Sequence, residues 1–145
     1  MSERQSEKPL PEVTPLNKPF WDAAARHEFV VQRCRRCGRF IWYPRGSCPY
    51  CGSRDLEWTR PRETGTVYAS TIARVVVGNS PAWEKEMPYA VAIVDMDDGF
   101  RIYGRVLGIR PEDVRPGLRV RIDFEDLASG VAVPVFRPLG RAPDP

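Results

Sequence analysis

The stretch Cys34-Arg35-Arg36-Cys37-Gly38, followed by Cys48-Pro49-Tyr50-Cys51-Gly52, contains all four cysteines of the chain. Within each pair, the spacing lets one backbone turn point two thiolates at a single metal ion. The ten residues between the pairs are enough for a short hairpin, and the glycine after each pair can adopt positive φ. The pattern predicts a tetrahedral four-thiolate site, which has no open position and is therefore structural rather than catalytic.

Zinc is the metal that this spacing favours, and two alternatives stay open. Iron is one, because Cys-Pro-x-Cys-Gly also occurs in rubredoxin, although its two knuckles lie further apart in sequence. Redox or disulfide chemistry is the other, although disulfides need an oxidising compartment. The N-terminal MSERQSEKPLPEV lacks the apolar segment of a secretory signal, and no later run approaches the roughly 18 apolar residues of a membrane span. We therefore expect a cytoplasmic protein with reduced thiols.

Length and composition set the size and class of the protein. The 145 residues allow one ordinary domain, or one small domain with an appendage, and an apolar content of 42% is enough to bury a core. The 22 basic residues include 19 arginines, which favour bidentate contacts with phosphate or carboxylate. However, 19 acidic residues offset them, so the charge does not demand a nucleic-acid partner. The 15 prolines favour short strands and turns over long helices.

Residues 17–28, NKPFWDAAARHE, predict one short helix, with Asn17 as its cap and Pro19 in its first turn. A helix of this length is marginal by itself in water. Its aromatic pair, Phe20 and Trp21, must therefore dock on another surface. That surface is either the core of this protein or a partner.

The remaining sequence predicts a mainly β protein with flexible ends. Residues 1–16 form a polar, proline-containing arm, and residues 138–145 a disordered tail. Residues 29–60 form the metal-binding ribbon, and residues 61–137 contain five strands. The strands are GTVYASTIARVVV, YAVAIVDM, FRIYGRVLG, LRVRIDFE and VAVPVF, with a helical turn at RPEDVRPG and a partial edge at Pro134. A long first strand and a helical insert after the third suit the small closed barrel of an OB-fold.

No set of acid, base and nucleophile stands out in the chain. His27, the only histidine, is expected to lie on a helix face rather than to act as a catalytic or metal-binding group. Asp95, Asp97 and Asp98 could supply a carboxylate pair, but the turn at Asp98-Gly99 explains them more simply.

Two surfaces are candidates for ligand or partner binding. Arg101, Tyr103 and Arg105 alternate along the third barrel strand, and we expect them to project together from its outer face. Such a stripe could stack a base and hold phosphates, or it could be an ordinary solvated surface. Trp83 lies in a loop framed by prolines, where it could anchor a ligand or partner, or plug the mouth of the barrel.

The order of these parts resembles a known family. The motifs are the helix with Phe20-Trp21, the two cysteine knuckles, GTVYAST from Gly65, Pro88-Tyr89, and Gly117-Leu118-Arg119-Val120. The chain resembles the acyl-CoA-associated OB-fold family with a rubredoxin-like zinc ribbon, catalogued as domain of unknown function thirty-five. The resemblance covers roughly residues 17–137.

The resemblance implies a function in lipid metabolism. Members accompany thiolase-like enzymes, hydroxymethylglutaryl-CoA synthase, and aldolases of sterol side-chain breakdown, where they order the catalytic partner and help to shape the acyl-CoA passage. It implies one structural zinc ion held by Cys34, Cys37, Cys48 and Cys51, with no catalysis by the chain itself. We therefore expect a hetero-oligomer with an acyl-CoA enzyme that binds a CoA thioester. The alternative is a module that binds single-stranded nucleic acid, because OB barrels and zinc ribbons also serve that role.

Overall fold

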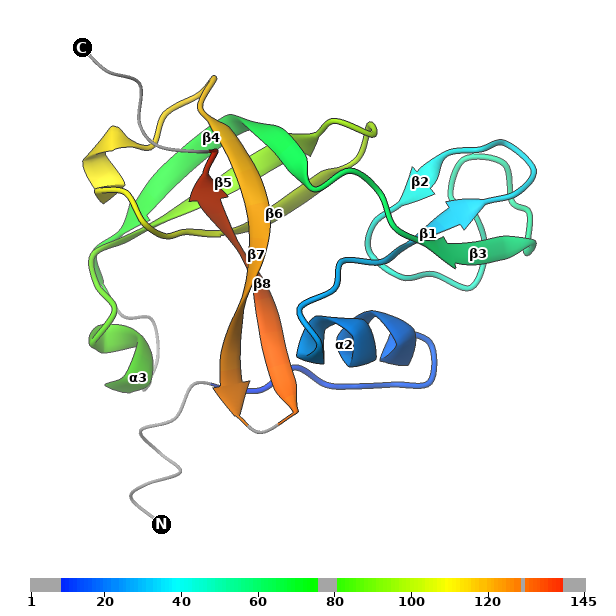
Figure 1. Ribbon diagram of the computed structural model, residues 1–145, viewed down its shortest axis with the longest axis horizontal. Helices are drawn as coiled ribbons and strands as arrows, with labels where there is room; N and C mark the ends of the chain where they lie inside the picture. Colours follow the sequence, from blue (N-terminus) through cyan, green and yellow to red (C-terminus); the bar gives the residue numbers. More distant parts are fainter. Residues whose placement is uncertain (1–8, 76–80, 129, 140–145) are drawn as a thin grey trace.

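The computed structural model describes residues 9–75, 81–128 and 130–139, and it confirms the mainly β fold (Figure 1). A helix, α2 (Lys18–Ala25), precedes a three-stranded ribbon and a closed barrel. The ribbon strands are β1 (Val31–Cys34), β2 (Phe40–Ile41) and β3 (Leu56–Thr59). The barrel strands are β4 (Thr64–Ala73), β5 (Tyr89–Met96), β6 (Arg101–Val106), β7 (Arg119–Ala128) and β8 (Val131–Pro138). Two short helical segments, α3 (Pro81–Glu84) and η1 (Pro111–Asp113), lie between barrel strands.

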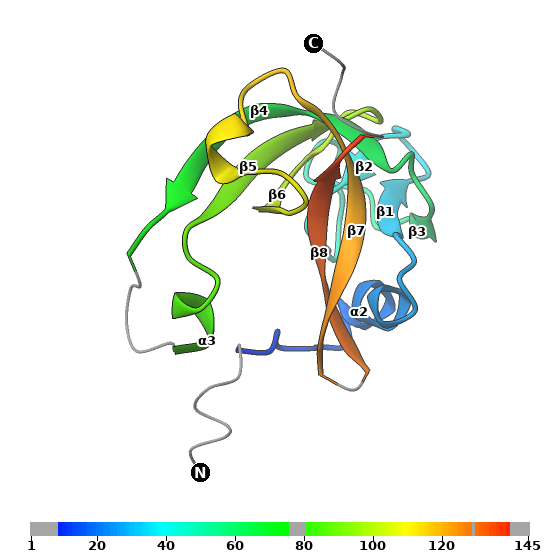
Figure 2. The same ribbon diagram turned by 60° about the vertical axis from the view of Figure 1, so that its left-hand side comes forward.

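The barrel closes in the order β4-β5-β6-β8-β7, with β4 and β7 completing the ring (Figure 2). Alternation in the sequence explains how each strand faces the core. In β7, for example, Val120, Ile122 and Phe124 are buried, whereas Arg119 and Arg121 are exposed. The five strands, this connectivity and the helical turn η1 after β6 are those of an OB-fold.

Among the described residues, the barrel has its fewest register pairs where β6 meets β8. The two strands run parallel, and their register contains a single pair, Val106 with Phe136. Pro134 pairs only with Phe124 on the β7 side, in a part of β8 that has no register partner on β6 among the described residues. Proline cannot donate a backbone hydrogen bond, so this position tolerates it, and the expectation of a partial edge is confirmed.

The N-terminal helix is shorter than expected and is held differently at its start. It ends at Ala25, because the chain leaves the helix before His27, which has a left-handed φ of 61°. Pro19 occupies the first turn as expected, but the Asn17 side chain makes no capping hydrogen bond. Instead, its Oδ1 accepts from the Thr14 amide at 2.7 Å, and its Nδ2 donates to the Tyr43 hydroxyl at 3.2 Å. Asn17 therefore links the N-terminal segment to the ribbon.

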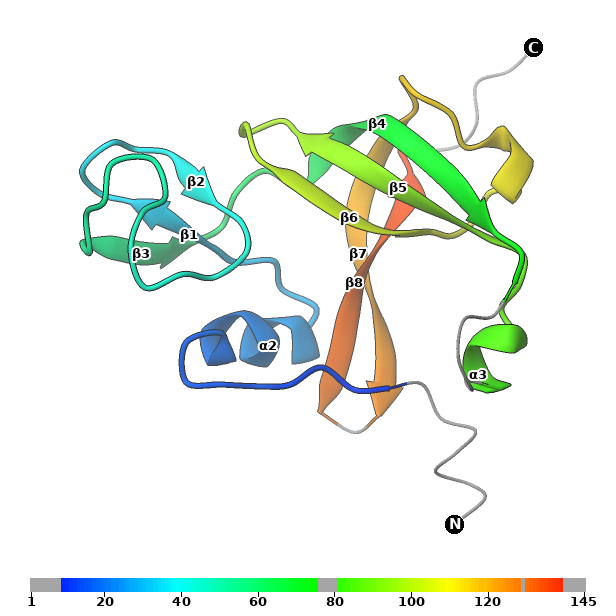
Figure 3. The same cartoon turned by 180° about the vertical axis from the view of Figure 1, so that it is seen from behind.

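One hydrophobic core joins the helix, the ribbon and the barrel. The helix packs beside β8 at the lower end of the barrel (Figure 3). Phe29 and Phe40 from the ribbon side contact Phe100, in the turn between β5 and β6, with ring centroids 6.2 and 6.0 Å apart. The ribbon is therefore packed against the barrel rather than tethered to it.

Parts of three sequence expectations lie outside the described residues. These are residues 1–8 of the expected arm, residues 140–145 of the expected tail, and residues 76–77 of the expected first barrel strand. Within the described part of the chain, none of the helices has the length and apolar character that crossing a membrane would require.

Candidate metal centre and ligand-binding surfaces

The two cysteine knuckles have nearly the same backbone geometry. In the first, the Gly38 amide donates to the Cys34 carbonyl at 2.8 Å, and in the second, the Gly52 amide donates to the Cys48 carbonyl at 2.9 Å. Both glycines have positive φ, 81° and 80°, a conformation that side chains strongly disfavour. Each turn thus directs two sulfurs to the same side, as the spacing predicts.

The four sulfurs, all from reduced cysteines, form a compact cluster that fits one metal ion. Their Sγ atoms lie within 4.8 Å of one another. The Cys34–Cys51 and Cys37–Cys48 sulfurs are 3.6 and 3.7 Å apart. A Zn–S bond of about 2.3 Å places the sulfurs of a tetrahedron roughly 3.8 Å apart, whereas a disulfide needs about 2.05 Å. The cluster therefore has the dimensions of a tetrathiolate zinc site and not of two disulfides.

Electrostatics within the cluster favour a cation at its centre. The Cys37 amide, 3.4 Å from the Cys34 sulfur, lowers the pKa of Cys34 to about 6. At Cys51 a hydrogen bond from the Ser53 backbone lowers the pKa, but burial and the neighbouring sulfurs outweigh it and raise the pKa to about 11. Four adjacent thiols cannot all ionise without a balancing positive charge, which a divalent metal would supply.

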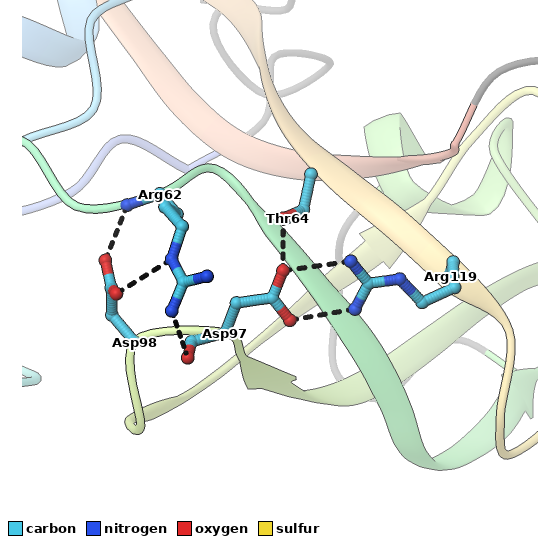
Figure 4. A network of polar contacts seen from close by, with 5 residues as sticks. All are labelled: Arg62, Thr64, Asp97, Asp98 and Arg119. Atoms are coloured by element: carbon cyan, nitrogen blue, oxygen red, sulfur yellow. Dashed lines mark hydrogen bonds and ion pairs between the residues drawn. The ribbon is translucent and has the colours of Figure 1, made fainter.

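The residues considered for acid–base chemistry have structural partners instead. Asp97 accepts from Arg119 at 2.8 and 2.9 Å and from the Thr64 hydroxyl, while Asp98 accepts from the backbone and side chain of Arg62 (Figure 4). These hydrogen bonds, chiefly from Arg119 and then from Thr64, hold the pKa of Asp97 well below its usual range. The two carboxylates thus tie β4, β7 and the turn after β5 together.

The other two candidates are also engaged. Asp95 forms an ion pair with Arg101 at 2.5 Å. His27 lies beyond the helix, contrary to expectation, and its Nε2 is 2.9 Å from Asp126. Among the described residues, the side-chain partners of Asp95 and His27 are thus Arg101 and Asp126 rather than a serine, threonine or cysteine.

The expected outward stripe on β6 does not form, because Arg105 is buried. Its exposed fraction is only 6%, compared with 71% for Tyr103. The guanidinium contacts Glu125 and Glu86, the latter at 3.3 Å, and lies 4.8 Å from the ring centroid of Trp83. Trp83 and Glu86, in and just after α3, lie against this end of the strand, which the alternation of residues could not reveal. The exposed part of the expected stripe therefore contains Arg101 and Tyr103 but not Arg105.

The aromatic candidates divide between the core and the surface. Phe20 is 1% exposed and packs edge-on against Trp42 at 5.0 Å, so of the two docking surfaces expected for it, it occupies the core of this protein. Trp21 is half-buried, and its indole N–H donates to the Tyr43 hydroxyl at 2.9 Å. Trp83 is also half-buried, beside Tyr89 and Arg105. Trp21 and Trp83 thus keep only part of their surface available for a ligand or partner.

An apolar hollow of about 350 Å³ on β4, β5 and β6 was missed by sequence reasoning. Its lining comprises Ala69, Ser70, Thr71, Val91, Ala92, Ile93 and Tyr103. Ile93 and Tyr103 are register partners on adjacent strands, and both are exposed. Beside them, the Arg101 guanidinium lies 3.9 Å from the ring centroid of the exposed Tyr68. A bulge at Val67/Ala69 shifts the alternation of β4, so the sequence pattern alone could not bring these residues together.

The fold and the cysteine cluster define a protein in which a four-cysteine zinc ribbon is packed on an OB barrel. Family models agree: residues 21–57 match the "ChsH2, rubredoxin-like zinc ribbon domain", and residues 58–125 match the "ChsH2, C-terminal OB-fold domain". The chain belongs to this family of ChsH2-like DUF35 proteins, as the resemblance indicated.

Two curated relatives match this chain over different shares of their own length. A "DUF35 domain-containing scaffold protein" of Methanocaldococcus jannaschii is 31% identical over 100 residues, which cover 68% of this chain and 69% of that protein. A "Probable enoyl-CoA hydratase alpha subunit" of Thermomonospora curvata is 33% identical over 131 residues, or 90% of this chain. The matching part is only 40% of that hydratase subunit.

A solved structure is similar over nearly its whole length. A chain of the "Ltp2-ChsH2(DUF35) aldolase" has 34% sequence identity to this protein and superimposes with a TM-score of 0.78. The superposition covers 88% of this chain and 98% of the aldolase chain. The ribbon and the barrel together therefore account for nearly all of that chain.

Proposed function

We propose that this protein is a non-catalytic accessory subunit of an acyl-CoA-processing complex. Its partner would be a thiolase-like enzyme or an aldolase, which it would order while helping to bind or guide the acyl-CoA. The observation that carries the proposal is the similarity to the aldolase chain, 98% of which is covered by this fold. The names of the relatives, a scaffold protein and an enoyl-CoA hydratase subunit, point in the same direction.

The polar contacts of the described residues support a non-catalytic role. The carboxylates of Asp95, Asp97 and Asp98 are each paired with an arginine. The four thiols converge on one metal position, which leaves none of them as a nucleophile. A subunit that orders another enzyme needs surfaces rather than reactive groups.

The apolar hollow on β4, β5 and β6 is our candidate for the contact with the partner or the acyl group. Its exposed members, Ile93 and Tyr103, would bury apolar surface on association. Arg101 and Tyr68 at its border could add polar and stacking contacts, and Trp21 and Trp83 are further candidates.

Purification of the tagged protein from the cells that produce it tests the proposal. We expect an acyl-CoA enzyme to copurify in a fixed ratio and to turn over its CoA thioester, and this chain alone to turn over none. We also expect the enzyme to lose activity or solubility when this chain is removed. Recovery of no CoA-dependent enzyme, or full activity of the enzyme without this chain, would contradict the proposal.

A matched pair of variants tests the apolar hollow. We expect Ile93→Asp to reduce the amount of copurified enzyme at least tenfold, because it places a charge in the proposed contact. Leu139→Asp is the control, since both side chains are 41% exposed and Leu139 lies outside the hollow. Equal losses in the two variants would show that the hollow has no special role.

We further propose that Cys34, Cys37, Cys48 and Cys51 hold one structural zinc ion, in a reducing compartment such as the cytoplasm. The ribbon has little core of its own, so metal binding would supply much of its folding free energy. We expect Cys48→Ser to lose zinc and unfold the ribbon, as measured by metal analysis and near-ultraviolet circular dichroism. Ser47→Ala, one residue earlier, should keep both. A Cys48→Ser protein that stays folded with full zinc would refute the structural role.

A further inference from the structure

The positive charge of the chain is concentrated in the ribbon. Residues 29–60 contain seven arginines and only two acidic residues, Asp55 and Glu57, a formal charge of +5 before the thiolates are counted. The whole chain carries only +3, so the rest of the molecule is slightly acidic. A zinc ion with four thiolates would contribute −2, which leaves the ribbon positive. An anionic ligand would therefore be attracted to the ribbon rather than to the barrel.

Two of these arginines line a hollow and form no ion pair with the residues that the structure describes. Arg35 pairs with Asp55 and Glu57, and Arg60 pairs with Glu28. Within residues 9–75, 81–128 and 130–139, neither Arg45 nor Arg54 has a carboxylate at ion-pair distance. Both line one hollow of about 640 Å³, together with Leu16, Pro44, Gly46, Ser47 and Pro49. This volume lies within the range of small-ligand sites.

The backbone of this hollow is held by a buried glutamine. Gln32, on β1, is 5% exposed, and its Nε2 donates to the Arg45 carbonyl at 2.8 Å. Its Oε1 accepts from the Arg45 amide at 2.7 Å. At its other end, the loop runs through Ser47 directly into Cys48, which belongs to the second cysteine knuckle. The loop is thus fixed at both ends, so the Arg45 backbone need not be ordered when a ligand binds.

We propose that this hollow binds the diphosphate group of a small organic ligand. The guanidinium groups of Arg45 and Arg54 would form charge-assisted hydrogen bonds to the phosphate oxygens, and the Ser47 hydroxyl would donate a third. Leu16, Pro44 and Pro49 offer apolar surface to the organic part of the ligand. Only the identification of this ligand as an acyl-CoA rests on the function proposed above; the anion site itself does not.

Isothermal titration of the full-length, zinc-loaded protein with inorganic pyrophosphate tests the site. We expect saturable binding, and we expect Arg45→Gln and Arg54→Gln each to weaken it about tenfold, the size of one charge-assisted contact. Arg36→Gln is the control, because it removes the same charge from an exposed ribbon residue outside the hollow. We expect it to change the affinity less than twofold.

Two results would overturn the site. One is the absence of pyrophosphate binding at millimolar concentration. The other is an equal loss in Arg36→Gln and Arg45→Gln, which would indicate a diffuse charge effect. Zinc content and circular dichroism of each variant establish that it is folded. Arg45→Lys provides a second measurement at the same position, because lysine keeps the positive charge but lacks the forked guanidinium.

Three further probes identify the source of the diphosphate. Coenzyme A that binds tighter than ADP would favour an acyl-CoA ligand, and equal affinities would favour a general diphosphate site. Both results support the hollow. A single-stranded oligonucleotide that binds more tightly than all three diphosphates, with a steep salt dependence, would overturn it in favour of a nucleic-acid surface. We expect Arg45→Gln to copurify the acyl-CoA enzyme as the wild type does, because the proposed enzyme contact lies outside the ribbon hollow. This measurement therefore tests the accessory function separately from the diphosphate site.

Discussion

At the scale of single residues, Arg105 was expected on the outer surface of the barrel but is buried. The guanidinium is held between Glu86, which follows α3, and Glu125 on β7, with Trp83 packed against it. A buried charge of this kind persists only when its partners compensate for the lost hydration. Arg105 therefore fixes the segment around α3 to the barrel.

Arg105→Met should lower the free energy of unfolding by about 3 kcal/mol, because it removes the buried guanidinium that contacts both carboxylates. We take the lower end of the usual range, since both carboxylates keep some contact with water. Urea denaturation at pH 7 measures this loss in the free energy of unfolding. Arg101→Met, which breaks the exposed pair with Asp95, should cost less than about 1 kcal/mol. Similar losses in the two variants would contradict the buried role of Arg105.

Asp97 should make stability depend on pH. Hydrogen bonds from Arg119 and Thr64 depress its pKa in the folded state. A depressed pKa contributes stability above the unfolded-state value of about 3.9, and that contribution is lost as pH falls toward the folded-state pKa. We therefore expect Asp97→Asn to lower the free energy of unfolding at pH 7, and the difference from the wild type to shrink below about pH 4. Denaturation at pH 7, 4 and 3 measures it; a difference independent of pH would contradict this explanation.

At the scale of elements, β4 depends on a glycine that alternation patterns ignore. At Gly65, β4 pairs with β5 on one side and with β7 on the other. A Cβ atom added there would lie 2.7 Å from the Asp95 carbonyl oxygen and 2.7 Å from a methyl group of Val94. The strands can come this close only without a side chain.

Gly65→Ala should therefore destabilise the barrel by about 1–3 kcal/mol, the usual effect of overpacking a core. Gly46→Ala is the matched control, because a Cβ atom there would meet nothing within 4 Å. We expect the control to change the free energy of unfolding by less than about 0.5 kcal/mol. Thermal and urea denaturation of both variants measure the effect. If Gly65→Ala left the free energy of unfolding unchanged, the strands would be able to move apart at no cost in stability, which would contradict this explanation.

At the scale of the whole molecule, three aromatic rings join the ribbon to the barrel. Phe100 is buried in the turn between β5 and β6, and it contacts Phe29 and Phe40 from the ribbon side. Because this contact belongs to one continuous core, we expect the two parts to unfold together.

Phe100→Ala should lower the free energy of unfolding by about 3–5 kcal/mol. It should also separate the unfolding transition of the ribbon from that of the barrel. In the zinc-loaded wild type, we expect metal release and loss of the β signal to occur at the same urea concentration. In Phe100→Ala, zinc release should occur first, because the ribbon loses its support. Tyr103→Ala, which removes an exposed ring from the same barrel, is the control. Coincident transitions in Phe100→Ala would show that the joint does not depend on this ring.

The sequence by itself determined the features that depend on local spacing. Two Cys-x-x-Cys-Gly turns define the metal cluster, since each turn needs only its own backbone geometry. Alternation in β7 and the turn at Asp98-Gly99 likewise reflect contacts between neighbours in the chain, and the order of the motifs identified the family. These features could be predicted because little beyond adjacent residues decides them.

Only the tertiary structure decided which side chains are available at the surface. Arg105 and Phe20 follow patterns that allow exposure, but segments distant in sequence cover both of them. The bulge in β4 assembles the apolar hollow, and Gln32 holds Arg45 from a separate strand. Burial and register depend on long-range packing, which residue periodicity along one strand does not contain.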